Sequence, residues 1–156
     1  MHVFATGRES NLVKRVLKHS KAGERKRIAA RDALSESARQ LIRACEMVAE
    51  AREVLRHGDF QSFCADLGVA PRDASRMVQV GRHERLTDRS VISKLPFDPK
   101  VIFELARLDP RPFDGLLAAG IISPGLNRTQ AGRLVRMTDA GIDVARLWKT
   151  RHARKG

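Results

Sequence analysis

The stretch that decides the fold is residues 60–79, FQSFCADLGVAPRDASRMVQ. Its first half predicts a short helix, because Phe63 and Leu67 lie one turn apart and would share the inner face. Gly68 then favours a turn, since glycine takes a positive φ at little steric cost. Pro71 fits the first turn of a second helix, where its fixed φ is already helical. The stretch therefore predicts two short helices joined by a tight turn, the layout of a helix-turn-helix.

The second of these helices has one apolar and one polar face. Ala74, Met77 and Val78 would pack inward. The outward residues follow helical spacing and are candidates for contacting DNA: Arg72, Ser75, Arg76, Gln79, Arg82 and His83. Arg pairs with a guanine edge, Gln with an adenine edge, and Ser with bases or phosphates, so this face suits a major groove. The alternative is a helical hairpin whose basic face is only solvated.

Two helices are predicted ahead of the motif. A short amphipathic helix would cover residues 10–19, with apolar residues on one side and Lys and Arg on the other. A longer one is indicated by apolar residues that recur every three, four or seven positions between residues 34 and 55. His57 and Gly58 are expected to close it, because Gly suits the position after a helix end. Asp59 would then cap the first helix of the motif.

Downstream of the motif, every recognisable element is again helical. The second motif helix is expected to continue to about Arg85, while residues 87–94 favour neither helix nor loop. Three further helix starts are marked by capping residues: Asp98, Asp109 and Asn127. One or two more turns are expected over residues 142–148, and residues 149–156 are expected to be disordered.

These observations predict an all-α protein with a helix-turn-helix domain, six to eight helices and basic, partly disordered termini. The expected organisation is a basic arm with a short helix at residues 1–31, a helical domain at 32–145 and a basic tail at 146–156. No stretch shows the period-two alternation of a half-buried strand.

The net charge of +12 lies at the two ends of the chain. Residues 1–31 hold nine Lys or Arg and two Glu, a net charge of +7, and residues 146–156 hold five Lys or Arg and no acid. The 114 residues between them are neutral. Basic arms on a balanced domain are typical of proteins that bind a polyanion, although charged tails can also serve solubility alone. The expected phosphate contacts in the N-terminal arm are Lys14, Arg15, Lys18, Arg25, Lys26 and Arg27.

No pattern in the sequence indicates catalysis. There is no Gly-rich phosphate loop, no nucleophile motif and no His or Cys cluster with ligand spacing, so no enzyme, metal site, cofactor or small-molecule substrate is expected. Cys45 and Cys64 indicate small buried residues in a reducing cytoplasm. No apolar run of about 18 residues is present, which predicts no membrane span.

Two segments together resemble known DNA-binding families. Residues 51–86, AREVLRHGDFQSFCADLGVAPRDASRMVQVGRHERL, resemble small phage- and plasmid-borne helix-turn-helix proteins. Residues 95–135, LPFDPKVIFELARLDPRPFDGLLAAGIISPGLNRTQAGRLV, are similar in layout to the region that follows the helix-turn-helix in ParB-type partition proteins. The resemblance implies sequence-specific binding to double-stranded DNA on a mobile element, at a promoter or at a centromere-like array.

The function that these inferences favour is a transcriptional regulator that binds DNA as a homodimer in the bacterial cytoplasm, at the nucleoid or on a plasmid. Dimerisation follows the habit of the motif. The alternatives are a plasmid partition or conjugation accessory factor, a nucleic-acid binder that uses charge alone, and a protein-interaction adaptor.

Overall fold

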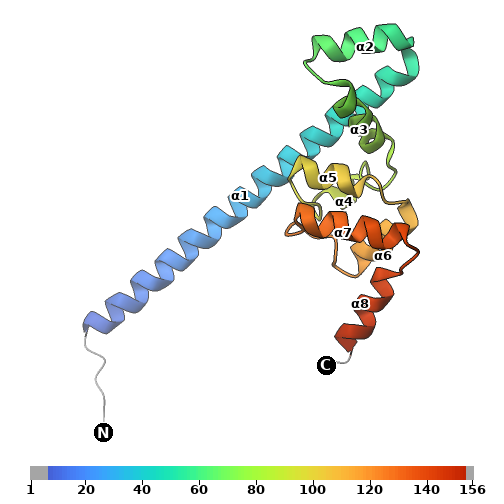
Figure 1. Cartoon of the computed structure of the whole chain (residues 1–156). Coiled ribbons are helices and arrows are strands. Elements are labelled where there is room, and N and C mark those ends of the chain that lie inside the picture. The colour runs from blue at the N-terminus through green and yellow to red at the C-terminus, as the bar shows by residue number, and fades with distance from the viewer. Residues whose placement is uncertain (1–6, 154–156) are drawn as a thin grey trace. The chain divides into compact units, whose positions relative to one another are not determined.

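The computed structural model describes residues 7–153, and the side chains of residues 20–153. Within that range it contains eight helices and no strand, so the all-α prediction and the expected number of helices are confirmed there (Figure 1). The helices are α1 (Gly7–Val54), α2 (His57–Asp66), α3 (Pro71–Arg82), α4 (Arg89–Ile92), α5 (Pro99–Leu105), α6 (Pro110–Ala118), α7 (Arg128–Asp139) and α8 (Val144–Ala153). The chain divides into two units, Met1–Leu34 and Ser35–Gly156, and α1 contributes residues to both.

Helix α1 is one continuous helix of 48 residues, so the prediction of two separate helices in this region is wrong. The intervening residues 20–33 are mostly Ala, Lys, Arg and Glu, which have high helix propensity. Glu24 and Arg27 also form an ion pair one turn apart. Gly23 costs about 1 kcal/mol relative to Ala at an exposed helix position, which is too little to break a helix with these neighbours.

The junction between α1 and α2 also differs from the prediction. Helix α1 ends at Val54, and His57 and Gly58 begin α2 instead of closing α1. The N-cap of α2 is Arg56, with an extended backbone (φ −64°, ψ 156°), and Asp59 lies inside the first turn. An acidic residue there still interacts favourably with the positive end of the helix dipole.

The Ser35–Gly156 unit has two clusters of buried apolar side chains. The main core gathers residues from α1 and from every helix between α3 and α7, with Ile42, Leu105 and Phe113 fully buried. A smaller core joins the end of α1 to α2 and α3. Helix α3 belongs to both, because Val80 lies in the main core and Ala74 in the smaller one. Met77 packs against both cores, so α3 is held on both sides.

The predicted helix starts are confirmed in position, with different amounts of capping. The Asn127 side chain accepts a hydrogen bond from the Gln130 backbone N–H (2.8 Å), and the Gln130 side chain accepts one from the Asn127 N–H (3.0 Å), which completes a capping box. Asp98 caps α5 by accepting a hydrogen bond from Lys100 N–H (3.0 Å). Asp109 occupies the N-cap of α6 but makes no side-chain capping bond.

Two boundaries are corrected further along the chain, and one undecided stretch is resolved. Helix α3 ends at Arg82, before the predicted Arg85, and the undecided residues 87–94 contain the short helix α4. Asp88 starts α4, and hydrogen bonds from Ser90 hold the pKa of this carboxyl below its usual range. Residues 149–153, which were expected to be disordered, belong to α8. Residues 154–156 lie outside the described part of the chain.

Gly81 allows α3 to approach α1 closely. A Cβ atom added at this position would lie 2.8 Å from Ala49 Cβ and 2.7 Å from the Cys45 carbonyl carbon.

We expect Gly81→Ala to lower the free energy of unfolding by about 1–3 kcal/mol in urea titrations, because the backbones must move apart. Gly58→Ala is the matched control, since nothing lies within 4 Å of its added Cβ. It should be neutral or stabilising by up to about 1 kcal/mol, and equal destabilisation by both substitutions would contradict this role of Gly81.

Candidate nucleic-acid interface

Helices α2 and α3 form the predicted pair of short helices joined by a tight turn. Gly68 has a φ of +72°, as expected for a residue that reverses the chain after a helix. The turn is closed by a hydrogen bond from Val69 N–H to the Cys64 carbonyl (2.9 Å). Leu67 is a correction, because it is 57% exposed and not on the inner face. Helix α2 ends one residue earlier, and the half-buried Val69 packs against the smaller core instead.

The outward face of α3 carries the polar residues that were singled out from the sequence. Arg72, Ser75, Gln79 and Arg82 are exposed. Arg76 is partly buried and lies 4.0 Å from the Asp73 carboxylate, and Arg82 lies 3.9 Å from that of Glu53. Exposed pairs of this length contribute little free energy. Both guanidinium groups are therefore available to an anionic partner at low cost.

His83 is a correction to the sequence-based site, because its side chain is only 8% exposed. Its Nδ1 accepts hydrogen bonds from the backbone N–H groups of Arg85 and Leu86, each at 3.2 Å. A neutral imidazole that accepts at Nδ1 carries its proton on Nε2, and Nε2 donates to the Leu108 carbonyl at 2.7 Å. The ring also packs against Phe113, with centroids 5.3 Å apart. His83 therefore ends α3 and joins it to the main core.

A hollow of about 360 Å³ lies between the end of α1, α2 and α3, and Ser75 lies at its edge. Its floor includes the buried Phe60 and Cys64. The Arg52 guanidinium lies 5.0 Å from the centre of the Phe60 ring, and its Nη1 is 3.2 Å from His57 Nδ1. Gln61 contacts the other nitrogen of the same imidazole.

Sequence reasoning missed these three exposed side chains, Arg52, His57 and Gln61. His57 had been assigned to a helix end, and no periodicity signals that Arg52 and Gln61 lie beside the turn. The i, i+4 spacing of His57 and Gln61, which places both on one side of a helix, could have paired these two residues, but nothing in the sequence connects Arg52 to them.

The basic residues of the N-terminal arm fall into two groups. Arg25, Lys26 and Arg27 are exposed on α1, and Arg27 pairs with Glu24. The predicted phosphate contacts Lys14, Arg15 and Lys18 lie on the same helix, but their side chains fall outside the described residues. No acidic residue occurs in residues 25–31, so this part of α1 presents positive charge only.

Potential metal-ligating side chains are scattered over the described residues. Among them, no three His, Cys, Asp or Glu side chains gather closely enough to hold a metal ion. Burial raises the pKa of the Cys45 thiol to about 11, and nearby Glu46 adds to the shift, so Cys45 is protonated near neutral pH and behaves as a small apolar residue. In the same part of the chain, no helix has the length and apolar content needed to cross a membrane.

Replacing His83 should test its structural role. We expect His83→Ala to lower the free energy of unfolding by about 3 kcal/mol, because buried backbone groups lose their partners and the ring leaves a cavity. The neighbouring exposed Arg82→Ala should change it by less than about 0.5 kcal/mol. Urea unfolding followed by circular dichroism measures both. A similar small effect for the two substitutions would show that the His83 ring does not support the core.

No model of a protein family matches this chain, and no match is found among curated proteins or among solved structures. The resemblance to phage, plasmid and ParB-type proteins therefore stays a prediction.

Proposed function

We propose that this chain is a sequence-specific double-stranded DNA-binding protein that places α3 in the major groove. The observation that carries the proposal is the two-sided character of α3. Its inner side is anchored in both cores by Ala74, Met77 and Val80, while Arg72, Ser75 and Gln79 are exposed on the other side. An α-helix with its side chains is about 10–12 Å wide, and the major groove of B-DNA is about 12 Å wide.

Within this proposal, side chains on α3 divide between bases and phosphates. Arg72, Arg76 and Gln79 carry the donors and acceptors that distinguish base edges, with Ser75 contacting bases or phosphates. Arg82 lies at the end of the helix, where a phosphate contact suits its position. Arg52 and the start of α2 border the same hollow as Ser75, which makes them further candidates for holding the DNA backbone.

The basic residues of α1 would add attraction that does not depend on sequence. Each Lys or Arg that neutralises a phosphate releases a condensed counterion, so these contacts strengthen binding to any duplex and weaken as salt rises. The exposed candidates are Arg25, Lys26 and Arg27. A protein that combines these phosphate contacts with base recognition by α3 would serve as a transcriptional regulator, or as a partition or conjugation accessory factor, on a bacterial mobile element.

A homodimer is part of this proposal, because helix-turn-helix proteins commonly bind two half-sites on one face of the duplex. Half-sites of a dimer lie about 34–36 Å apart, one helical turn of DNA. A single inverted repeat near a promoter would favour the regulator, and a long array of repeats would favour the partition factor.

The second candidate function is a nucleic-acid binder that uses charge alone. It is favoured by the placement of the whole net charge of +12 in residues 1–31 and 146–156. Such a protein would bind every duplex equally, with an affinity that falls steeply with salt. Its binding would also survive the loss of any one side chain on α3.

Selection from a pool of random-sequence duplexes tests the proposal directly. We expect successive rounds of binding at about 0.15 M salt to enrich one sequence, since non-specific attraction is weakened there. Fluorescence anisotropy should then show that the full-length protein prefers this duplex over a base-shuffled one by about a thousandfold or more. No enrichment, with equal affinity for both duplexes, would support the charge-driven alternative.

Arg76 provides a test of base recognition by α3. We expect Arg76→Ala to weaken binding to the selected duplex by about 1–3 kcal/mol and to relax the preference at one base pair. Arg107→Ala is a matched control, because Arg107 is similarly exposed and pairs with Glu104 at the same i, i+3 spacing. It should leave the preference unchanged. An equal loss on the selected and shuffled duplexes would show that Arg76 contacts only phosphates.

A further inference from the structure

The last helix, α8, packs only weakly on the rest of its unit. None of its ten residues is buried. Leu147 is 56% exposed and Trp148 is 41% exposed, although both are large and apolar. An isolated helix of this length is marginal in water, and most helix stability in proteins comes from burying an apolar face. Helix α8 therefore presents apolar side chains that another surface can cover.

A shallow hollow beside α8 extends this apolar surface onto α7. It has a volume of about 520 Å³ and is lined by Met137 of α7 together with Val144, Leu147 and Trp148 of α8. Ile142, in the turn between the two helices, is also 40% exposed. We name Met137, Val144, Leu147, Trp148 and Arg151, which line this hollow, the α8 surface.

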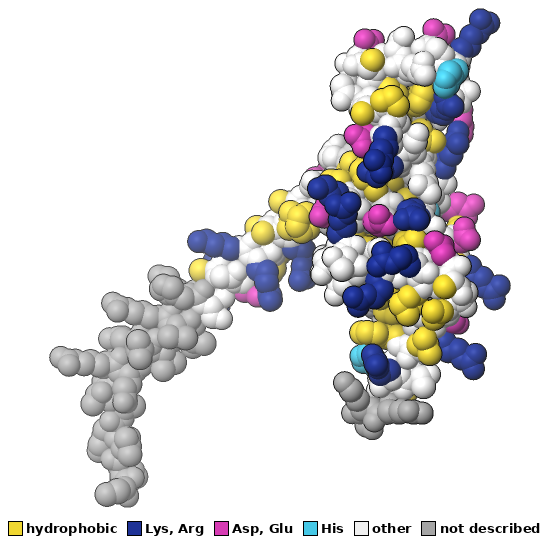
Figure 2. All heavy atoms as spheres, in the orientation of Figure 1, with side chains coloured by type: hydrophobic (Ala, Val, Ile, Leu, Met, Phe, Trp, Pro, Cys, Tyr) yellow, Lys and Arg dark blue, Asp and Glu magenta, His cyan; other side chains and the backbone are white. Residues whose placement is uncertain are grey.

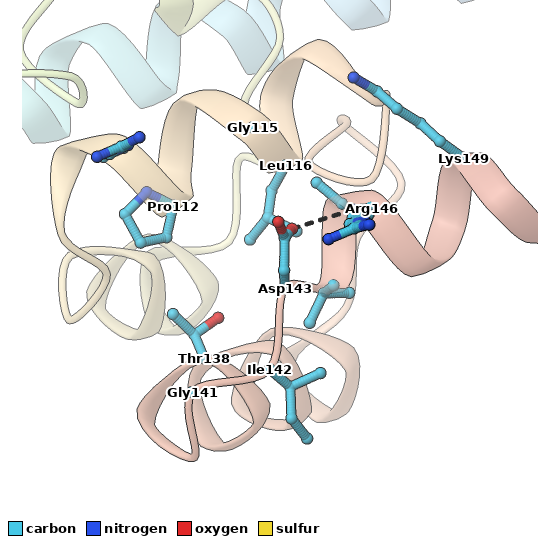
Figure 3. A pocket seen from close by; sticks show the side chains of 12 residues that line it. Pro112, Gly115, Leu116, Thr138, Gly141, Ile142, Asp143, Arg146 and Lys149 are labelled. Carbon is cyan, nitrogen blue, oxygen red and sulfur yellow. Dashed lines mark hydrogen bonds between the residues drawn. The ribbon is translucent and has the colours of Figure 1, made fainter.

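A second hollow, of about 550 Å³, lies at the start of α8 next to α6 (Figure 3). There Asp143 caps α8 by accepting a hydrogen bond from Arg146 N–H (3.0 Å). Helix α8 therefore has its own N-terminal cap, and it borders a hollow on the α6 side in addition to the hollow beside α7. This arrangement is consistent with a helix that is formed in advance and available to a partner.

Arg151 is the charged residue that lines the hollow beside Leu147 and Trp148, while Arg146 and Lys149 line the second hollow. The charged residues of α8 are Arg146, Lys149 and Arg151, and the helix contains no acidic residue. Where Figure 1 places α8, Figure 2 shows apolar side chains next to Lys and Arg side chains. The Trp148 ring stacks on His152, with centroids 3.9 Å apart, which orders the indole before any partner binds.

We propose that the α8 surface binds an acidic, amphipathic helix of another protein. The exposed Leu147 and Trp148 would pack against the apolar stripe of that helix. Trp and Arg are among the residues that most often dominate the binding energy of protein interfaces, and this surface contains both. Arg151 would pair with a carboxylate beside the stripe, and the positive charge of α8 as a whole would speed the encounter. This inference is independent of the DNA-binding proposal, which depends on α3.

The same observations disfavour two other occupants. A symmetric contact between α8 helices of two copies would bring together two helices that each carry three basic residues and no acidic one, and this like charge opposes the contact. DNA would satisfy the charges but would leave Ile142, Leu147 and Trp148 against a polar, highly charged surface. An acidic amphipathic helix satisfies both the apolar and the basic side chains.

Trp148 makes the test direct, because it is the only Trp in a chain that has no Tyr. The probe is a designed peptide of about four helical turns with a Leu stripe flanked by Glu and with Ala and Gln on the outer side. The full-length protein is titrated with it at about 0.15 M salt, and the fluorescence of Trp148 is recorded. We expect saturable binding at least about tenfold tighter than for a peptide of the same composition in scrambled order, or for one with Lys in place of Glu.

A matched pair of substitutions distinguishes peptide binding at the α8 surface from non-specific binding elsewhere on the protein. Leu147→Ser should weaken peptide binding by about tenfold or more, as expected at the centre of an interface. Leu67→Ser, on the α2–α3 turn, changes a side chain of almost equal exposure and should have no effect. Arg151→Glu should shift the preference toward the Lys peptide. Leu147→Ser, which changes no charge, should leave affinity for a DNA duplex unaltered, so failure here leaves the DNA-binding proposal intact.

Three results would overturn the proposal. Equal binding of the ordered and scrambled peptides would show attraction by charge alone. A change in Trp148 fluorescence with duplex DNA, competing with the peptide, would assign the α8 surface to nucleic acid. Self-association in sedimentation velocity that Leu147→Ser abolishes would assign it to a second copy of the chain.

Discussion

The close approach of α3 to α1 at Gly81 is the constraint on which the rest of the Ser35–Gly156 unit depends. With no side chain at this position, α3 lies almost against the Cys45 carbonyl and Ala49. This contact sets the depth at which Val80 enters the main core and Ala74 enters the smaller one. Because interiors are packed nearly as densely as crystals, fixing one side of α3 also fixes which side faces solvent. The polar face proposed to read DNA is thus a consequence of apolar packing on the opposite side.

The end of α3 is fixed in a different way, by hydrogen bonds instead of close packing. His83 uses both ring nitrogens on backbone groups, at Leu108 on one side and at Arg85 and Leu86 on the other. These buried bonds matter because an unpaired polar group in the interior is costly. Close packing at Gly81 and hydrogen bonds at His83 therefore both fix the C-terminal end of α3. A fixed helix favours base recognition, because misplaced side chains lose their hydrogen-bond geometry.

The two proposed surfaces differ in chemistry, and the difference follows from how much each helix buries. Helix α3 buries its apolar side chains in two cores and exposes mostly polar ones, so its free face suits a nucleic acid. Helix α8 packs only the partly buried Val144 and Ala145 on the main core and exposes Leu147 and Trp148 beside Arg151, so its free face suits a protein. A DNA-binding protein that recruits an acidic partner would use both surfaces at once.

The local features of this protein could be predicted from its residues alone: the all-helical class, the turn at Gly68 and the caps at Asp98 and Asn127. These depend on residues within a few positions of one another, where spacing and backbone preference act directly. Only the tertiary structure decided which residues of the candidate site are exposed. His83 continues the polar spacing of α3, yet it is buried because Leu108 and Phe113, which follow 25 or more residues later, surround it. Leu67 was expected to be buried and is exposed, because α2 ends before it and Val69 packs on the smaller core instead. Burial is set by contacts between distant parts of the chain, which periodicity does not encode.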